Sequence, residues 1–391
     1  MRTFIKPSWA VLFAVLSLSS TGLRNNVLSG TTLANATTDS TTSQALIYKV
    51  DPDWPHLPPG RPEATRLQRR IGYQHGDVAV SSSGDVYVSV QNMWHVSVLL
   101  DGRKVDADMP LPTEYADPYA GLQVYAPDGT YLRNVPGSPT DFHGFIIHKE
   151  SGGEFIYGAR VAETHAPLDQ TKADWYRQAI VKMTLGGKIV LTIPASAIPE
   201  TFRGRRDGAT YMRLTDVAVG PNGDIYVSDG YSSDYVHRFD KSGKYLSSFG
   251  GKAAPYNFST LHKLALDTRF SPQRLIAADR ANNRIVHLSL DGDFIGVVAK
   301  DMLLPAAIAI WNDYAVVAEL KGQITILDKA GNTVTTFGTN TVPDEQANRL
   351  LEPARWRPGI VTAPHGVAVN AHGDIFISEL NSFGRVHRFN H

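Results

Sequence analysis

The sequence predicts an all-β fold, a six-bladed β-propeller whose ring is closed by an N-terminal strand. Short apolar runs flank -NGD-, -SGD- and -HGD- turns, a pattern typical of β-hairpins. A second hairpin follows most copies, so each unit is a four-stranded antiparallel meander of roughly 40–50 residues. Six such units, with weak helical periodicity throughout, indicate six blades.

The copies of the first hairpin justify the blades one by one. The clearest copies are DVAVSSSGDVYVS (residues 77–89), DVAVGPNGDIYVS (216–228) and GVAVNAHGDIFIS (366–378). Weaker copies begin at residues 144, 263 and 307. The sixth unit ends after its third strand, and ALIYKV (45–50) can supply the missing outer strand. We therefore expect the two ends of the chain to share one blade.

Composition excludes several classes of protein. Lys+Arg and Asp+Glu both number 38, so the formal net charge is zero and the chain has no global basic footprint for nucleic acid. Cysteine is absent, which excludes disulfides and thiolate catalysis. Any metal must therefore be held by His, Asp, Glu or backbone oxygen.

The first 36 residues are typical of a signal peptide. Arg2 and Lys6 precede the apolar run AVLFAVLSL (10–18), which is too short to span a membrane. Ala34-Asn35-Ala36 offers a cleavage site, and a cut near Ser19 is the alternative; a buried N-terminal helix is the structural alternative. We expect a linker at 37–45, the propeller at 46–391, no membrane span in the mature protein, and a secreted or periplasmic location.

Histidines recur at one position of the repeat. The residue before the first apolar run of units one to six is Gly76, His143, Thr215, His262, Ala306 and His365. Alternate blades of a six-fold ring lie 120° apart, so three imidazoles converge if this position faces the channel. Three histidines with an open fourth position are a common geometry for catalytic zinc. His143, His262 and His365 are thus the predicted metal ligands, with His75 as an outer neighbour or a surface residue.

Two further side chains are candidates for catalysis. Tyr231 follows the second apolar run of the third unit, between the blades of His143 and His262, and a tyrosine beside a metal is a candidate general base. The alternative for Tyr231 is ring packing. Arg160 at the end of the second unit is suited to an anionic substrate group, or to an ordinary salt bridge. The recurring acids Asp229, Asp279 and Glu379 are expected to hold loop backbones.

With these residues in place, the chain resembles the NHL-repeat propellers and, among them, the peptidyl-α-hydroxyglycine α-amidating lyases. The clearest stretch is LTDVAVGPNGDIYVSDGYSSDYVHRFDKSGKYLSSFGG (214–251), and it continues through LHKLALD, LIAADRANNRIVHL and APHGVAV. VDPDWPHLPPG (50–60) resembles the corresponding N-terminal segment of bacterial members. The resemblance covers most of the chain after about residue 46.

The resemblance implies a zinc enzyme. The family's three zinc-binding histidines correspond to His143, His262 and His365, and its catalytic tyrosine, in an SDGY segment, corresponds to Tyr231. The implied reaction cleaves a carbinolamide C–N bond to an amide and glyoxylate, with zinc on the substrate hydroxyl and Tyr231 taking its proton. A structural calcium ion is also implied.

The chain departs from the family at two places. Residues 90–92 (VQN) stand where the family has an arginine, and APHG (363–366) stands where it has MPHD. The second change removes an aspartate implicated in calcium binding and in the active site, and Asp77 or Asp216 are candidates to compensate.

Three functions remain open from the sequence. One is a secreted zinc-dependent lyase acting on a small-molecule or peptide substrate. The second is a metal-dependent hydrolase such as a lactonase on the same ring, and the third is a non-catalytic binding propeller. We expect a monomer in each case.

Overall fold

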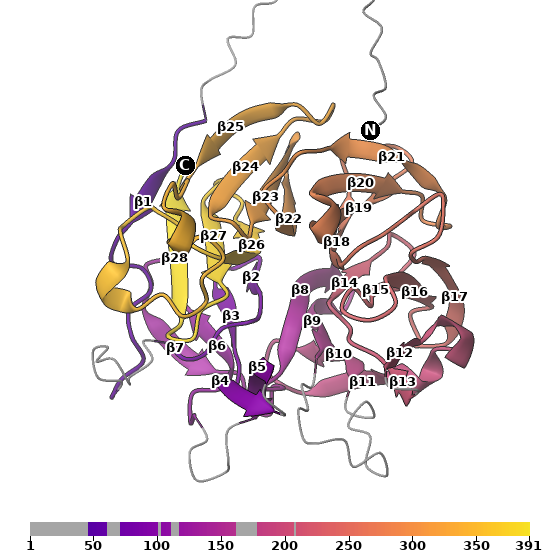
Figure 1. Cartoon of the computed structure of the whole chain (residues 1–391), viewed down its shortest axis with the longest axis horizontal. Coiled ribbons are helices and arrows are strands. Elements are labelled where there is room, and N and C mark those ends of the chain that lie inside the picture. Colours follow the sequence, from indigo (N-terminus) through magenta and orange to yellow (C-terminus); the bar gives the residue numbers. More distant parts are fainter. Residues whose placement is uncertain (1–45, 61–70, 101–102, 111–116, 162–177, 207–208) are drawn as a thin grey trace, which may run out of the picture. The chain divides into compact units, whose positions relative to one another are not determined.

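The computed structural model describes residues 46–60, 71–100, 103–110, 117–161, 178–206 and 209–391. The predicted signal peptide (1–36) and linker (37–45) lie outside these residues. Within them, six four-stranded antiparallel sheets form the blades of a propeller, which confirms the predicted fold (Figure 1).

Each blade is a meander whose first strand lies innermost. Blades 1 to 3 consist of β2 (Val78–Val80), β3 (Val86–Val90), β6 (Gly121–Tyr125) and β7 (Tyr131–Asn134); β8 (Phe142–Glu150), β9 (Gly153–Arg160), β10 (Ala179–Thr184) and β11 (Ile189–Pro194); β14 (Asp216–Val219), β15 (Ile225–Ser228), β16 (Tyr235–Phe239) and β17 (Tyr245–Gly250). Blades 4 and 5 consist of β18 (Leu261–Asp267), β19 (Arg274–Asp279), β20 (Arg284–Leu288) and β21 (Phe294–Ala299); β22 (Pro305–Trp311), β23 (Tyr314–Glu319), β24 (Gln323–Leu327) and β25 (Thr333–Phe337).

The sixth blade joins the two ends of the described chain. Its strands are β26 (Pro364–Val369), β27 (Ile375–Glu379), β28 (Arg385–Asn390) and β1 (Lys49–Asp51). Lys49 pairs with Asn390 and Asp51 with Arg388, so the N-terminal strand supplies the missing outer strand, as the sequence predicts.

The hairpin turns follow from their residues. In the third blade, Gly223 has a φ of +88°, a conformation that residues with a side chain rarely adopt. Asn222 Oδ1 accepts a bond from the Asp224 backbone N–H at 3.1 Å and so stabilises the turn. This turn sets the register in which Asp216 pairs with Ser228.

The cores lie between neighbouring blades. Residues of blade 2 such as Tyr157 and Ile180 share one buried cluster with Val217 and Ile225 of blade 3. The innermost strands β2, β8, β14, β18, β22 and β26 each contact the next one round the ring, β26 returning to β2. Six strand starts are thereby brought around one centre.

Insertions within and between blades form short elements of their own. The hairpin of β4 (Met93–Leu100) with β5 (Arg103–Pro110) lies within blade 1, between β3 and β6, and the hairpin of β12 (Gly204–Arg206) with β13 (Ala209–Tyr211) lies between blades 2 and 3. Short 3₁₀ turns stand at η4 (Ala195–Ala197), η5 (Glu200–Phe202), η6 (Arg280–Asn282), η7 (Pro343–Glu345) and η8 (Pro353–Arg355). Among the described residues, no helix has the length and apolar character needed to cross a bilayer.

Candidate metal centre

The three predicted histidines each occupy a β-bulge on an innermost strand. In β8, the register skips His143, because Phe142 pairs with Arg160 and Gly144 pairs with Ala159. The same skip falls at His262 in β18 and at His365 in β26. A bulge leaves one residue out of the ladder and re-aims its side chain. The bulges therefore turn the three imidazoles out of their sheets and toward the centre of the ring.

The three rings converge on one another. Ring centroids are 4.9 Å apart for His143 and His262, 4.8 Å for His143 and His365, and 4.7 Å for His262 and His365. All three side chains are buried. The alternation read from the sequence thus places three imidazoles at one point.

Each ring is oriented by a carbonyl of the next blade. His143 Nδ1 lies 2.6 Å from the carbonyl of Thr215, and His262 Nδ1 lies 2.6 Å from that of Ala306. His365 Nδ1 lies 3.3 Å from the carbonyl of Gly76. A carbonyl only accepts hydrogen bonds, so Nδ1 carries the proton and Nε2 keeps its lone pair. The three acceptors stand at the position of the repeat that the histidines occupy in the other blades.

Burial keeps the three rings neutral. It lowers the pKa of His143 well below the usual value, and the neighbouring His365 lowers it further. Burial also lowers the pKa of His262 well below its usual value, and the charge of Arg280 lowers it further. The pKa of His365 is lowered in the same way, first by burial and then by His75. Metal coordination needs this neutral form.

Tyr231 lies among these rings. Its hydroxyl oxygen is 2.9 Å from Nε2 of His262 and 3.1 Å from Nε2 of His143. The turn that carries Tyr231 is held by Asp229, whose Oδ1 accepts the Arg213 backbone N–H at 2.8 Å and whose Oδ2 accepts the Ser233 hydroxyl at 2.7 Å. Asp229 therefore ties the loop, as predicted, and burial raises the pKa of its carboxyl to about 7.

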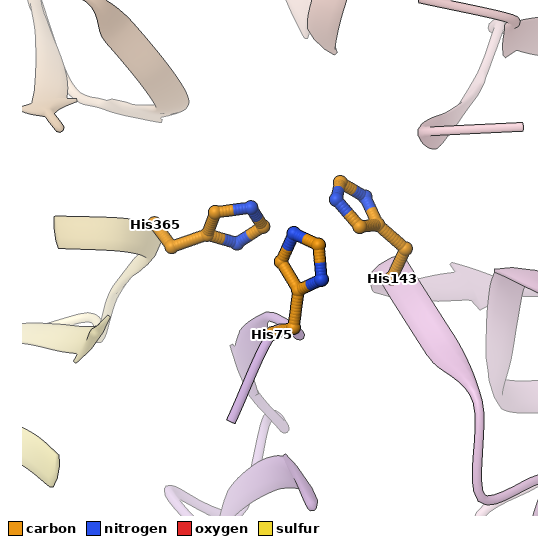
Figure 2. Close-up of side chains that lie close together, drawn as sticks. All are labelled: His75, His143 and His365. Carbon is orange, nitrogen blue, oxygen red and sulfur yellow. The ribbon is translucent and has the colours of Figure 1, made fainter. Parts of the chain in front are cut away.

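His75 is a fourth histidine at the centre, which the sequence left undecided between an outer neighbour and the surface. It is buried, and its ring lies 5.0 Å from those of both His143 and His365. Nitrogen atoms of His75, His143 and His365 lie within 4.8 Å of one another, and Figure 2 shows the three rings pointing toward a common point. Its Nε2 is 3.3 Å from the Tyr231 hydroxyl. The sequence signal for His75 was its position directly before Gly76, the aligned position of the first unit.

Two sets of three histidines are therefore candidate metal ligands. One set is His75, His143 and His365, and the other is His143, His262 and His365. We prefer His143, His262 and His365 as ligands, because all three share the bulge and the carbonyl bond to Nδ1. His365 Nε2 is moreover buried and has no hydrogen-bond partner among the residues that the structure describes, which fits an atom that binds a metal. An all-nitrogen set of three neutral imidazoles suits zinc among the common metals.

The arginine that contacts Tyr231 at the centre is Arg280, which was not predicted from the sequence. Arg280, in η6, donates from its Nη1 to the Tyr231 hydroxyl at 3.4 Å, and its guanidinium lies 5.2 Å from the Tyr231 ring centre. The guanidinium of Arg213 lies 4.9 Å from the same ring centre. Arg280 follows Asp279, one of the recurring acids, and that position was the available signal.

Arg160 is engaged by an acid. Its Nε and Nη2 donate to the two carboxylate oxygens of Asp141 at 2.8 and 2.9 Å. Arg160 pairs in register with Phe142, so it lies at the same end of blade 2 as His143. Arg160 therefore forms the ordinary salt bridge that was the predicted alternative to binding an anionic substrate group.

The departure at residues 90–92 also has a structural counterpart. Gln91 is buried, and its Nε2 donates to the carbonyl of Phe142 at 3.1 Å and approaches that of His75 at 3.4 Å. Gln91 thus links blade 1 to the strand of His143 and contacts the backbone of the fourth histidine.

The comparisons with known proteins point to amidating enzymes. No protein-family model matches the chain. It is 30% identical over 217 residues to peptidyl-alpha-hydroxyglycine alpha-amidating lyase 1 of Drosophila melanogaster, a match covering 51% of this chain and 38% of that protein. It is 27% identical over 199 residues to the probable peptidyl-alpha-hydroxyglycine alpha-amidating lyase pgal-1 of Caenorhabditis elegans, covering 49% and 52%.

Shorter and structural matches complete the picture. The peptidylglycine alpha-amidating monooxygenase of Rattus norvegicus is 40% identical over 98 residues, covering 24% of this chain and 10% of that protein. The chain thus spans about half or less of the curated relatives it matches. A streptogramin B lyase structure overlaps at a TM-score of 0.46 with 14% identity, covering 82% of this chain and 94% of that one. From its sequence matches and its fold together, the chain is a six-bladed propeller that resembles the peptidyl-α-hydroxyglycine α-amidating lyases.

Proposed function

We propose that the chain is a zinc-dependent lyase of the amidating type, which cleaves a carbinolamide C–N bond to an amide and glyoxylate. One observation carries the proposal. The hydroxyl of Tyr231 lies within 3.1 Å of the Nε2 atoms of two neutral histidines from alternate blades, beside a third. The similarity to enzymes named amidating lyases supports the choice of reaction.

The three histidines would hold the metal through Nε2. A zinc ion bound by them supplies a Lewis acid that polarises the substrate hydroxyl. The carbonyls of Thr215, Ala306 and Gly76 fix the three rings in the required tautomer before any metal arrives. Such outer partners are worth about 10–100-fold in metal affinity.

Tyr231 would handle the proton. As the C–N bond breaks, one proton leaves the substrate hydroxyl and one proton is gained by the departing amide nitrogen, so the net reaction needs no water. The Tyr231 oxygen is placed to accept the first proton and to return one to the nitrogen. Arg280 contacts this oxygen at 3.4 Å and is placed to orient it.

The guanidinium groups would bind the substrate carboxylate. Arg280 and Arg213 both lie over the Tyr231 ring, so positive charge gathers on the side of the site where the phenol stands. A guanidinium bonds a carboxylate in a two-point, charge-assisted fashion. We assign this role to Arg280 in preference to Arg160, because the Nε and Nη2 donors of Arg160 are already bonded to the two carboxylate oxygens of Asp141.

Metal analysis with matched variants tests the proposal. Protein purified without a His tag and incubated with zinc should hold about one zinc ion per chain. His143→Ala should lose the zinc and the release of glyoxylate from an N-acyl-α-hydroxyglycine. His148→Ala, on the same strand, should keep both.

Two results would overturn the proposal. Absence of zinc in the wild-type protein after incubation removes the metal centre. Bound zinc with hydrolysis of a lactone to a hydroxy acid, and with no glyoxylate from the carbinolamide, replaces the lyase by a hydrolase.

We also propose that the chain is exported, on the strength of the charged and apolar segments at residues 2–18. Sequencing the N-terminus of the protein recovered from the periplasm or medium tests this. A start shortly after residue 36 or near residue 20 supports export with cleavage, and recovery of an uncleaved chain from the cytoplasm contradicts it.

A further inference from the structure

A buried ion triad lies one residue along the chain from the candidate metal centre. The ammonium of Lys263 bonds an oxygen of Asp77 and lies 3.1 Å from Oδ1 of Asp216. The three side chains are 6%, 4% and 0% exposed. Asp77 also accepts the Val78 backbone N–H at 2.8 Å, and Asp216 accepts that of Leu264 at 2.9 Å. One ammonium thus joins blades 1, 3 and 4.

Each member of the triad is the chain neighbour of a group that builds the centre. Lys263 follows His262 directly. Asp216 follows Thr215, whose carbonyl orients His143, and Asp77 follows Gly76, whose carbonyl orients His365. The single cation therefore fixes the backbone beside one candidate ligand and beside the carbonyl partners of the two others.

The space around the triad is filled by its own carboxylates. Gly366 and Gly144 follow His365 and His143. A Cβ at Gly366 would lie 2.3 Å from Asp77 Oδ1, and a Cβ at Gly144 would lie 2.1 Å from Asp216 Oδ1. The two aspartates thus reach across to the neighbouring blades, over positions where a side chain is missing.

The residues present do not fit the structural calcium ion that the family resemblance implies. Calcium takes six to eight oxygen ligands, usually with several carboxylates. Here the aspartate expected after the last histidine is Gly366, and the two buried aspartates that could replace it are already bonded to an ammonium. A second cation at the same carboxylates would meet the charge of Lys263.

We infer that Lys263 is a built-in cation that takes the place of calcium at the centre of the ring and positions the three histidines. This inference has two halves: in the replacement half Lys263 takes the place of calcium, and in the positioning half it positions the three histidines. The positioning half rests on the proposed function, because it concerns the proposed zinc ligands. The replacement half does not rest on it. Lys263 is on this account a positioning residue, acting through Asp77 and Asp216.

The replacement half is tested on the zinc-loaded full chain. After removal of calcium on a chelating resin and readdition of zinc, calcium chloride is titrated while bound calcium and the melting temperature are measured. We expect no stoichiometric calcium and no shift in melting temperature. About one calcium ion per chain with a raised melting temperature would overturn the replacement.

The positioning half is tested by Lys263→Met, which removes the charge and shortens the unbranched side chain by one atom. We expect zinc affinity to fall about 10–100-fold, the magnitude typical of outer partners of metal ligands. The visible spectrum of the cobalt-substituted variant should also change, because the ligand geometry is no longer fixed.

The matched control is Arg269→Met in the same blade. Arg269 forms an equally buried pair with Asp267, at 2.8 and 2.7 Å, at the opposite end of β18 from His262. This variant should lose stability while its zinc affinity and cobalt spectrum stay unchanged. An equal loss of zinc affinity in both variants would show a general effect of destabilisation and overturn the positioning role.

A third variant guards against failure to fold. Lys263→Met combined with Asp77→Asn and Asp216→Asn removes all three charges and leaves the shapes nearly intact. If this folded protein binds zinc as tightly as the wild type, the positioning role of Lys263 is wrong. If the wild type binds no zinc at all, the proposed function fails instead, and the calcium titration still decides the replacement half.

Discussion

Gly144→Ala offers a sharp test of how the blades hold the histidines. A Cβ at this position would lie 2.1 Å from Asp216 Oδ1, 2.6 Å from the Thr215 carbonyl oxygen and 2.8 Å from Asp216 Cα. Ordinary contacts begin at 3.4 Å. The Thr215 oxygen would therefore have to move by about 0.8 Å, and backbone atoms yield less easily than side chains.

The displacement reaches the metal centre directly. The Thr215 carbonyl accepts the bond from His143 Nδ1 at 2.6 Å, so a shift of this size weakens or breaks it. We expect the variant to be destabilised by about 1–3 kcal/mol, the usual cost of overpacking. We further expect zinc affinity to fall about 10–100-fold, as when an outer partner of a ligand is lost.

Urea unfolding and competition with a chromophoric zinc chelator measure the two effects. Gly152→Ala is the control, because the described atoms nearest to a Cβ at Gly152 belong to Phe155, at 3.9 Å. It should change stability by less than about 0.5 kcal/mol and leave zinc binding alone. A Gly144→Ala protein with wild-type stability and zinc affinity would refute the account of the blade contact.

Three further predictions concern single side chains. Tyr231→Phe should retain zinc and lose glyoxylate release by about 100-fold or more, the contribution of a general acid–base group; full activity would exclude Tyr231 from proton transfer. Arg280→Met should weaken binding of an anionic substrate roughly 10–100-fold, the worth of a charged hydrogen bond, measured as KM under conditions where it equals Kd. Burial lowers the pKa of His237 to about 3 in the folded protein. In the unfolded chain the same residue gains its proton below about pH 6.5, so the unfolded state is favoured as the pH falls. Between pH 8 and 5 this group should lower the free energy of unfolding by about 2 kcal/mol. His237→Gln should lose that much less over the same interval in urea titrations, and an identical loss would contradict the shift.

The fold could be predicted because its signals are local and repeated. Alternation of apolar residues around turns such as that at Gly223 recurs in every blade, and strand register has a period of two. The position of the histidines in the repeat was sufficient to bring His143, His262 and His365 together, since equivalent positions of a ring meet at its centre. The same reasoning placed Tyr231 beside them.

The parts that escaped prediction depend on contacts between blades. A bulge at His143 changes the direction of one side chain, and the residue types around it do not predict a bulge. His75 lies one position off the alignment and reaches the centre from the segment before β2. Lys263 looks like an ordinary residue in its own unit, and only the meeting of three blades gives it two aspartate partners. Arg280 likewise becomes significant through the fold.

The closure of the ring by β1 has a consequence for damage to the protein. Only three residue pairs join β1 to β28. Loss of the residues up to 51 would remove β1 and none of the residues of the candidate metal centre, and it would expose the N–H and C=O groups along one side of β28. Such an open edge is a template for another chain. We therefore expect a proteolytic cut after residue 51 to leave an edge strand, β28, at which a second copy of the chain can pair.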